Sequence, residues 1–471
     1  MRKTALVLAA AMLTCTVSCS SKSVESVSSS DAPTYEQSTE SGEKVNITIA
    51  LAESPNTWRG WQHIWQKVEE LNSSDSPYTV EITRYEFDED DYNGDTSMNR
   101  LTLDILAGKS PDVVSAAPFQ LDKLSRNGYL TDLSPLMESG TGMTKEDFLD
   151  SVTDSVEKEG EINVIYPAFE VHTAAAKTEL VGDKENWTID DAISAYNSFN
   201  GDFLADMYTK YDIRHYFFYG AMMNCIDFNA HTCDFDSSLA PVLDFLTGLP
   251  PMEKRLGDNT AIIGQIHDNT ALVKEQWING INQSYASEVL RTFGNEPMTF
   301  VGYPTNNGRG SYTEISGGFG IMANSNHKEE AWGAVSELFF NDEFQREISD
   351  YGYGVPVRRS TFESLLNRSE YEQSAGDSPA ETADTGGKSN EMKTLVSEFE
   401  CPDGSEKSLS DAQIQQLSDF LSSLKIEPFV DPSMEHIIKE ESDYVFEGER
   451  SVQQCVEILQ NRIGLYLSET G

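Results

Sequence analysis

Basic residues are scarce in this sequence. Lysine and arginine total 34 against 78 aspartates and glutamates among 471 residues, which gives a formal net charge of −44 at pH 7. Nucleic-acid-binding proteins use lysine- and arginine-rich surfaces to displace counterions from phosphates, so the deficit excludes that class. It also disfavours direct adsorption to anionic lipid headgroups. Hydrophobic residues at 38% and aromatic residues at 10% exclude a chain that is disordered throughout.

After the N-terminal segment the sequence has no long hydrophobic run. The run near the start, Ala5–Leu13, follows a basic beginning and is too short to span a bilayer, which takes about 20 residues, but it is typical of a secretory signal peptide. Small residues then lead to Cys19, as at the lipidation site of bacterial lipoproteins, although Thr16 stands where leucine is usual. Cys15 is the competing site. We therefore expect a signal peptide over residues 1–18 and a lipidated Cys19; the alternative is a secreted protein with an unused cysteine.

Residues 19–44 are rich in serine and glutamate and almost free of bulky aliphatic side chains. Such a segment buries too little apolar surface to fold, so we expect a flexible tether. Signal peptide, acylated cysteine and tether together predict a globular body held by its lipid at the outer face of the cytoplasmic membrane, in the extracellular space.

Cysteine and histidine are also scarce, with six and seven residues. The four cysteines beyond the N-terminal segment have no CxxC spacing and no accompanying histidine cluster, so no zinc site is expected. One or two disulfides, or four free thiols, are equally compatible with their spacing. They are Cys225, Cys233, Cys401 and Cys455.

Familiar ligand and catalytic motifs are missing. The stretch Gly108–Ser110 lacks the leading glycine of a phosphate-binding loop and follows a predicted helix instead of preceding one. Asp88–Gly94 resembles a calcium loop, but Arg100 stands where a bidentate glutamate is required. No GxSxG or HExxH motif occurs, and among 78 acidic residues a pair of carboxylates carries no information about glycoside hydrolysis. We therefore expect no catalytic residue, no metal and no cofactor.

Strand and helix patterns alternate in the first part of the chain. Val45–Leu51 alternates and is β-branched, which predicts a strand, and Trp58–Leu71 has apolar residues at helical spacing. Tyr78–Thr83 predicts a second strand, Met98–Leu106 a helix and Asp112–Val114 a short buried strand. This alternation predicts an α/β fold with a mainly parallel sheet.

Later segments are richer in helix. Ser410 and Ser451 each begin a predicted helix, the second with a capping box that includes Gln454. Asn367–Lys393 is rich in serine, glycine and glutamate and is expected to be a surface loop. Further helices are predicted at residues 189–199, 239–249 and 283–293.

Aromatic residues in loops give the positive signal for function. Trp58 follows the first strand, where α/β sheets place ligands. Aromatic faces against the C–H faces of sugar rings, with carboxylates bonding the hydroxyls, hold neutral carbohydrate; core packing is the alternative role of each aromatic. Trp61, Trp65 and Trp332 have helix-core spacing and are assigned to the core. The candidate ligand aromatics are Trp58, Trp277, Tyr303, Tyr351 and Tyr353.

Several blocks, in order along the chain, resemble the extracellular solute-binding proteins (family 1) of bacterial ABC importers, the maltose-binding-like group. Leu103–Val114 resembles that family's helix-AG-x-x-PDV motif, and Gly128–Pro135 resembles its G-x-L-x-D-L-x-P segment. Three of the remaining blocks resemble the hinge crossings: residues 165–177, 316–321 with 331–332, and 354–358. Residues 186–191 resemble a helix that starts with a WTxDE motif, and residues 460–463 resemble the C-terminal helix.

The resemblance implies a two-lobed periplasmic-binding-protein-like fold of type II with three hinge crossings. The first α/β lobe would comprise residues 45–170 and 317–360, and the second, helix-rich lobe residues 171–316 and 361–471. It further implies a monomer without enzymatic activity that closes on a small-molecule solute, an oligosaccharide, and delivers it to the transmembrane subunits of an ABC permease.

The resemblance also implies site residues. Trp277 matches the second-lobe tryptophan that stacks on sugar in that family, and Trp58, Phe119, Glu170 and Tyr303 fall where first-lobe and hinge contacts lie. Glu170 is one residue away from the nearest family pattern. Two other functions stay open: a surface-displayed carbohydrate-degrading enzyme, and a receptor or sensor for a non-sugar solute such as a peptide, a polyamine or a metal chelate.

Overall fold

The computed structural model describes residues 44–54, 57–88, 95–205, 210–227, 232–249, 264–306, 310–315, 317–367, 409–426 and 432–470. The predicted signal peptide, the lipidation site Cys19 and Cys401 lie outside the described residues, as do nearly all of the tether and of the Asn367–Lys393 loop. Within the described ranges no helix combines the length and apolarity needed to span a bilayer.

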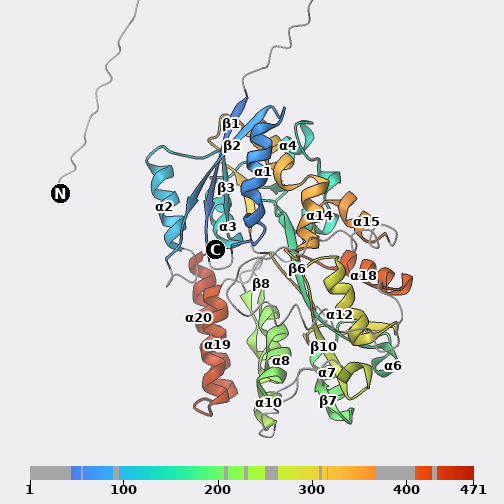
Figure 1. Cartoon of the computed structure of the whole chain (residues 1–471). Helices are drawn as coiled ribbons and strands as arrows, with labels where there is room; N and C mark the ends of the chain where they lie inside the picture. The colour runs from blue at the N-terminus through green and yellow to red at the C-terminus, as the bar shows by residue number, and fades with distance from the viewer. Residues whose placement is uncertain are drawn as a thin grey trace, which may run out of the picture. The chain divides into compact units, whose positions relative to one another are not determined.

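The first sheet has the strand order β13-β3-β1-β2. Figure 1 labels three of these strands, β1, β2 and β3. β1 (Val45–Ala52) runs parallel to β2 (Tyr78–Tyr85) and to β3 (Val113–Ala116), as the alternating pattern predicts. β13 (Gly318–Ile321) closes one edge by pairing antiparallel with β3. The strand most distant in sequence thus completes this sheet, next to the segments predicted to build it.

Helices cover this sheet. α1 (Trp61–Ser73) and α13 (Lys328–Phe339) pack on each other and on the strands, α2 (Asp95–Leu106) packs on β1 and β2, and α3 (Pro118–Arg126) packs on β3 and β13. Trp61 and Trp332 are buried in this core, as predicted.

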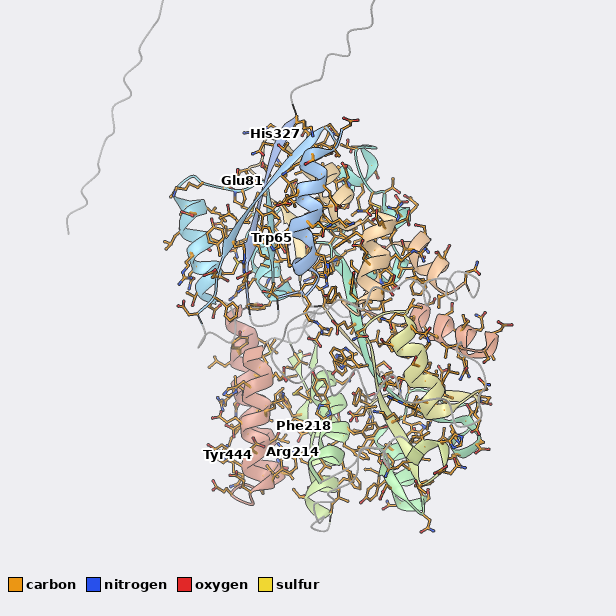
Figure 2. All side chains as sticks on the ribbon, in the orientation of Figure 1. Trp65, Glu81, Arg214, Phe218, His327 and Tyr444 are labelled. Atoms are coloured by element: carbon orange, nitrogen blue, oxygen red, sulfur yellow. The ribbon has the colours of Figure 1, made fainter. Side chains whose placement is uncertain are left out.

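Trp65 does not belong to the core, contrary to the prediction. Its ring, labelled on α1 in Figure 2, is 38% exposed, with the guanidinium of Arg84 lying 5.8 Å from the ring centroid. Helical spacing predicts that Trp65 lies beside Trp61 on one face of α1. The part of that face which is buried is narrower than the set of apolar residues in the sequence pattern. The side chain therefore lies at the edge of the helix, where an arginine covers it.

The second sheet is built around β6 (Ala168–Lys177), with the order β11-β6-β10-β7 and with β12 and β14 also paired to β6. All of the partners of β6 run antiparallel to it, whereas β7 runs parallel to β10. The prediction of a mainly parallel sheet is therefore wrong for this half, because alternation along the chain does not fix the direction of strands joined by long connections. The strands are β7 (Asp202–Leu204), β10 (Ala271–Ile278), β11 (Met298–Phe300), β12 (Tyr312–Glu314) and β14 (Val355–Pro356).

Helices predominate in the rest of this half, and the helix starts predicted at Ser410 and Ser451 are capped as expected. Thr188 and Asp191 form the capping box of α7 (Ile189–Ser198), and Ser451 with Gln454 caps α20 (Val452–Thr470) in the same way. α19 (Pro432–Phe446) packs along α20, and both pack on α10 (Ala240–Gly248). Other helices of this half are α8 (Lys210–Asn224), α12 (Gln283–Phe293) and α18 (Asp411–Ser423).

Smaller elements complete the described chain. They are α4 (Ser134–Glu138), η1 (Lys145–Asp147), α5 (Asp150–Val156), β4 (Glu157–Lys158), β5 (Glu161–Ile162), α6 (Thr178–Val181), β8 (Ile226–Asp227), β9 (Thr232–Cys233), α9 (Phe235–Ser238), α14 (Asp342–Asp350) and α15 (Arg359–Leu365).

β6 is the strand by which the chain enters the second sheet. Its first residues pair with β14, with Val355 opposite Phe169, and its middle pairs with β12, with Glu314 opposite Glu170. The chain returns to the first sheet between β12 and β13. The expected lobe boundary at residue 170 thus falls inside β6.

The described cysteines, Cys225, Cys233 and Cys455, are free thiols. Within the described ranges no group of three or more His, Cys, Asp and Glu residues is placed to hold a metal ion. Asp88, the first residue of the stretch that resembles a calcium loop, forms an ion pair with Arg100 at 2.9 Å. The rest of that loop lies almost wholly outside the described residues.

Candidate functional site

Aromatic and acidic side chains gather where β6, β10 and β12 approach the start of α1. Alternation along a strand places Glu170 and His172 on the same face of β6. Cross-strand pairing then sets Trp277 and Tyr312 opposite His172, and Glu314 opposite Glu170. We call the resulting group the aromatic–acid cluster; its members are Arg59, His63, Glu170, His172, His215, Tyr219, Glu275, Trp277, Tyr303, Tyr312, Glu314, Tyr351 and Tyr353.

Trp277 and Glu170 form the centre of the aromatic–acid cluster. The indole Nε1 of Trp277 donates a hydrogen bond to Glu170 Oε2 at 2.7 Å, and the Trp277 side chain is 47% exposed while Glu170 is only 7% exposed. Burial raises the pKa of Glu170, and the nearby guanidinium of Arg59 and the indole hydrogen bond act in the opposite direction. A buried carboxylate therefore holds an exposed indole ring in place.

Four rings, beginning with Trp277, form a stacked series. Trp277 and His172 have centroids 5.6 Å apart, His172 and Tyr312 4.6 Å, and Tyr312 and Tyr219 4.5 Å, with interplanar angles of 20°, 6° and 25°. Near-parallel stacking covers faces of the inner rings, so Trp277, at the end of the series and about half exposed, is the ring best placed to stack on a ligand.

Two carboxylates beside the stacked series each pair with a histidine. His172 Nε2 lies 3.0 Å from Glu314 Oε2, and this hydrogen bond lowers the pKa of Glu314. His215 Nδ1 lies 3.1 Å from Glu275 Oε1. These pairs leave carboxylate lone pairs free to accept hydrogen bonds from a ligand.

Tyrosine hydroxyls supply neutral hydrogen-bonding groups. Burial raises the pKa of Tyr219 to about 12, and burial together with nearby Glu275 raises the pKa of Tyr303 further. Tyr312 is shifted in the same direction, with burial as the largest cause. All three hydroxyls therefore keep their protons at neutral pH.

The start of α1 and the turn Tyr351–Tyr353 face this group from the other side. His63 stacks on Tyr351 with centroids 4.6 Å apart, and its Nε2 lies 3.1 Å from the Tyr353 hydroxyl. Arg59 lies 5.6 Å from the centroid of Trp277 and 6.0 Å from that of Tyr353, with Nη2 3.4 Å from Glu170 Oε1.

Glycine makes this turn possible. Gly352 has φ of +69° and Gly354 has φ of +132°, in the region that side-chain-bearing residues rarely adopt. A Cβ added to Gly354 would lie 2.7 Å from the Cβ of Ala168 in β6. The turn therefore packs directly on the strand that carries Glu170.

Sequence reasoning anticipated part of this cluster. Glu170, Trp277, Tyr351 and Tyr353 come together, and Tyr303 lies behind them, only 3% exposed and in ring contact with Tyr312 at 5.6 Å. The exposed members among these predicted residues, Trp277 and Tyr351, are those that present a ring surface to solvent.

Trp58 and Phe119 occupy different positions. Trp58 is 3% exposed; its Nε1 donates to the backbone oxygen of Tyr353 at 2.9 Å and its ring packs edge-on against Phe344. Trp58 is therefore a buried residue that holds the Tyr351–Tyr353 turn through this hydrogen bond. Phe119 is half-buried on α3, with the ammonium of Lys123 5.9 Å from its ring centroid.

Eight members of the cluster were not anticipated. The available signal was alternation: Glu170 and His172 in β6, and Tyr312 and Glu314 in β12, are polar or aromatic at every second residue of a strand. The pairing that unites them could not be read from the pattern, since His172 and Glu314 are 142 residues apart. The unanticipated members are Arg59, His63, His172, His215, Tyr219, Glu275, Tyr312 and Glu314.

No protein-family model and no curated protein matches the chain. Solved structures do match. An extracellular solute-binding protein of family 1 from Alicyclobacillus acidocaldarius has 14% identity and a TM-score of 0.54, over 90% of this chain and 98% of that chain. A sugar-binding protein from Xanthomonas citri has 13% identity and a TM-score of 0.55, over 90% and 98%. A cyclic alpha-maltosyl-1,6-maltose binding protein from Arthrobacter globiformis has 12% identity and a TM-score of 0.51, over 90% and 100%.

At these identities the likeness establishes the fold. The chain has the two-lobed α/β fold of the extracellular solute-binding proteins, and the resemblance noted in the sequence is confirmed at that level. Two designed esterases also match, with TM-scores of 0.52 and 0.53, so the fold alone does not decide between binding and catalysis.

Proposed function

We propose that this protein is an extracellular solute-binding receptor that captures a saccharide between two lobes and delivers it to an ABC permease. The observation that carries the proposal is the half-exposed ring of Trp277, oriented by the buried Glu170 at the centre of the aromatic–acid cluster. An exposed aromatic face beside carboxylates suits a sugar, which has an apolar C–H face and a rim of hydroxyl donors. Solved sugar-binding proteins of the same fold support this assignment.

The proposed mechanism is closure about β6. The first lobe would comprise residues 45–170 and 317–360 and the second residues 171–316 and 361–471. Arg59 and the Tyr351–Tyr353 turn approach the site from one side, and Trp277 approaches it from the other. A solute that bridges these groups stabilises the closed form, because its contacts with both sides exist only there.

The partners follow from this role. We propose that the receptor works as a monomer without catalytic activity, that a lipid on Cys19 holds it at the outer face of the cytoplasmic membrane, and that the transmembrane permease subunits receive its solute. The carbohydrate-degrading alternative predicts release of reducing ends from glycans by the purified protein, which this proposal does not.

The test is calorimetry with a panel of oligosaccharides on the Trp277→Ala variant. Loss of the stacking face is expected to weaken binding by about 2 kcal/mol, roughly 30-fold, with little change in thermal stability because the ring is half exposed. Trp65→Ala is the matched control, since that ring is 38% exposed on α1 but lies outside the cluster. Equal saccharide affinities in the wild type and Trp277→Ala would overturn the assignment.

A further inference from the structure

The aromatic–acid cluster has an unbalanced charge. It contains three carboxylates, Glu170, Glu275 and Glu314, and one guanidinium, that of Arg59. Glu170 is already buried, whereas the side chains of Glu275 and Glu314 are 34% and 49% exposed. With neutral histidines the cluster therefore holds two more negative than positive charges.

Closure of the site removes these carboxylates from water. An uncompensated buried carboxylate is costly, and the hydroxyls of a neutral sugar solvate it without cancelling its charge. Compensation has to come either from the solute or from protons taken up by the protein. Glu170, whose pKa is raised by burial, is one cluster group that can take up such a proton.

Arg59 shows that the cluster accommodates a cation. Its guanidinium lies near the rings of Trp277 and Tyr353, at 5.6 and 6.0 Å, and 3.4 Å from the Glu170 carboxylate. Aromatic faces combined with a carboxylate are the surroundings in which proteins hold organic cations.

Arg59 is held loosely in this position. Both hydrogen bonds of its Nη2, to Glu170 Oε1 and to the backbone oxygen of Gly352, are 3.4 Å long, against a usual N–H···O distance of about 2.9 Å. The side chain is 49% exposed. A solute cation at closer range could therefore take its place.

Resting on the proposed function, we infer that the solute carries a basic nitrogen: the site selects an amino sugar over its neutral counterpart. The ammonium group lies against the aromatic faces and is compensated by the cluster's carboxylates, while the ring stacks on Trp277. The excess negative charge likewise disfavours acidic sugars.

The test is calorimetry on the full mature chain with oligosaccharides of glucosamine and of galactosamine, each beside its N-acetylated form of equal length. The measurement is made at a pH at which the amines are protonated. Two buffers of different ionisation enthalpy are used, so that net proton uptake on binding is detected. We expect the amino forms to bind at least about tenfold more tightly, with weakening at high salt and no net proton uptake. Glu314→Gln and Glu275→Gln are each expected to reduce this preference severalfold, because each variant weakens binding of the amino forms more than binding of the N-acetylated forms. Glu288→Gln is the control, because Glu288 lies on α12, outside the cluster, where it pairs with Lys274 of β10.

N-acetylated or unmodified oligosaccharides that bind as tightly as the amino forms would overturn the inference and leave the proposed function standing. Proton uptake on binding of a neutral sugar would do the same, since protons taken up by the protein would then supply the compensating charge. Failure of every saccharide, amino or neutral, to bind would instead overturn the proposed function and this inference with it.

Discussion

The indole Nε1 of Trp277 donates to the carboxylate of Glu170 at 2.7 Å, joining a ring that is 47% exposed to an acid that is 7% exposed. The two residues lie on neighbouring strands, β10 and β6, so the sheet fixes their separation. The orientation of the exposed indole thus depends on a side chain that is itself almost inaccessible to solvent.

Comparison of Glu170→Gln with Glu170→Ala separates the effect of the hydrogen bond that orients Trp277 from the effect of the charge of Glu170. The Gln amide oxygen still accepts the indole hydrogen bond, so Glu170→Gln should retain the position of Trp277, whereas Glu170→Ala should release it and weaken ligand binding by about tenfold more than the glutamine variant. Calorimetry gives the affinities. Equal affinities in the two variants would show that the hydrogen bond does not orient the ring.

The pKa of Glu170 predicts a pH dependence of stability. Burial raises this pKa, so the folded state binds a proton more tightly than the unfolded state and the contribution of Glu170 to stability falls as pH rises above the ordinary range of a glutamate. The Glu170→Gln variant should therefore be more stable than the wild type at neutral pH. The difference should shrink at pH values below the ordinary pKa range of a glutamate. Urea unfolding from acidic to neutral pH measures this difference; a difference independent of pH would contradict it.

Glu314 should behave in the opposite way. Its pKa is lowered by the hydrogen bond from His172, so its contribution to stability is present above the ordinary glutamate pKa and disappears as pH falls through the lowered value. Glu314→Gln should cost stability at neutral pH and progressively less in acid, by a small amount because the side chain is 49% exposed. The same unfolding series checks this, and a larger cost in acid would refute it.

Gly354→Ala tests the turn that carries the tyrosine pair. A Cβ at this position meets the Cβ of Ala168 at 2.7 Å and the backbone has φ of +132°, so we expect a loss of about 2 kcal/mol of unfolding free energy and weaker ligand binding. Gly464→Ala in α20 is the control. Apart from its own helix and chain neighbours, no atom of the described residues lies within 4 Å of its added Cβ, so this helical substitution should be neutral or stabilise by up to about 1 kcal/mol.

Trp332 and Trp65 provide a test of the core assignment. Trp332 is 1% exposed and its Nε1 donates to the backbone oxygen of Met143 at 3.0 Å, so Trp332→Ala should cost about 3–5 kcal/mol in chemical denaturation. Trp65→Ala, at a half-covered position, should cost much less. Similar losses in the two variants would mean that Trp65 is packed as tightly as Trp332.

Local signals predicted the first sheet and the helix caps. β1 and β2 follow from alternating β-branched residues, and the start of α20 follows from Ser451 and Gln454, because each depends on residues only a few positions apart. Trp332 was placed in the core by helical spacing on α13. The same reasoning failed for Trp65, since spacing gives the direction of a side chain but not the width of the surface that covers it.

The candidate site was predictable only in part, because it is made by pairing between distant segments. Trp277 was anticipated through the family resemblance and Glu170 through its position near a hinge. His172, Tyr312 and Glu314 meet because β12 lies along β6, and nothing in either strand's sequence identifies the other as its partner.

β6 has a consequence for the kinetics of the proposed receptor. Phe169 is paired with β14 and Glu170 with β12, so adjacent residues near the start of β6 have different partner strands. In the proposed closure about β6, a bend at this point would rotate the carboxylate of Glu170. Substitutions at residues 168–170 should therefore alter the residence time of the solute as well as its equilibrium affinity. Substitutions at the end of β10 that is distant from Trp277 should leave the release rate unchanged.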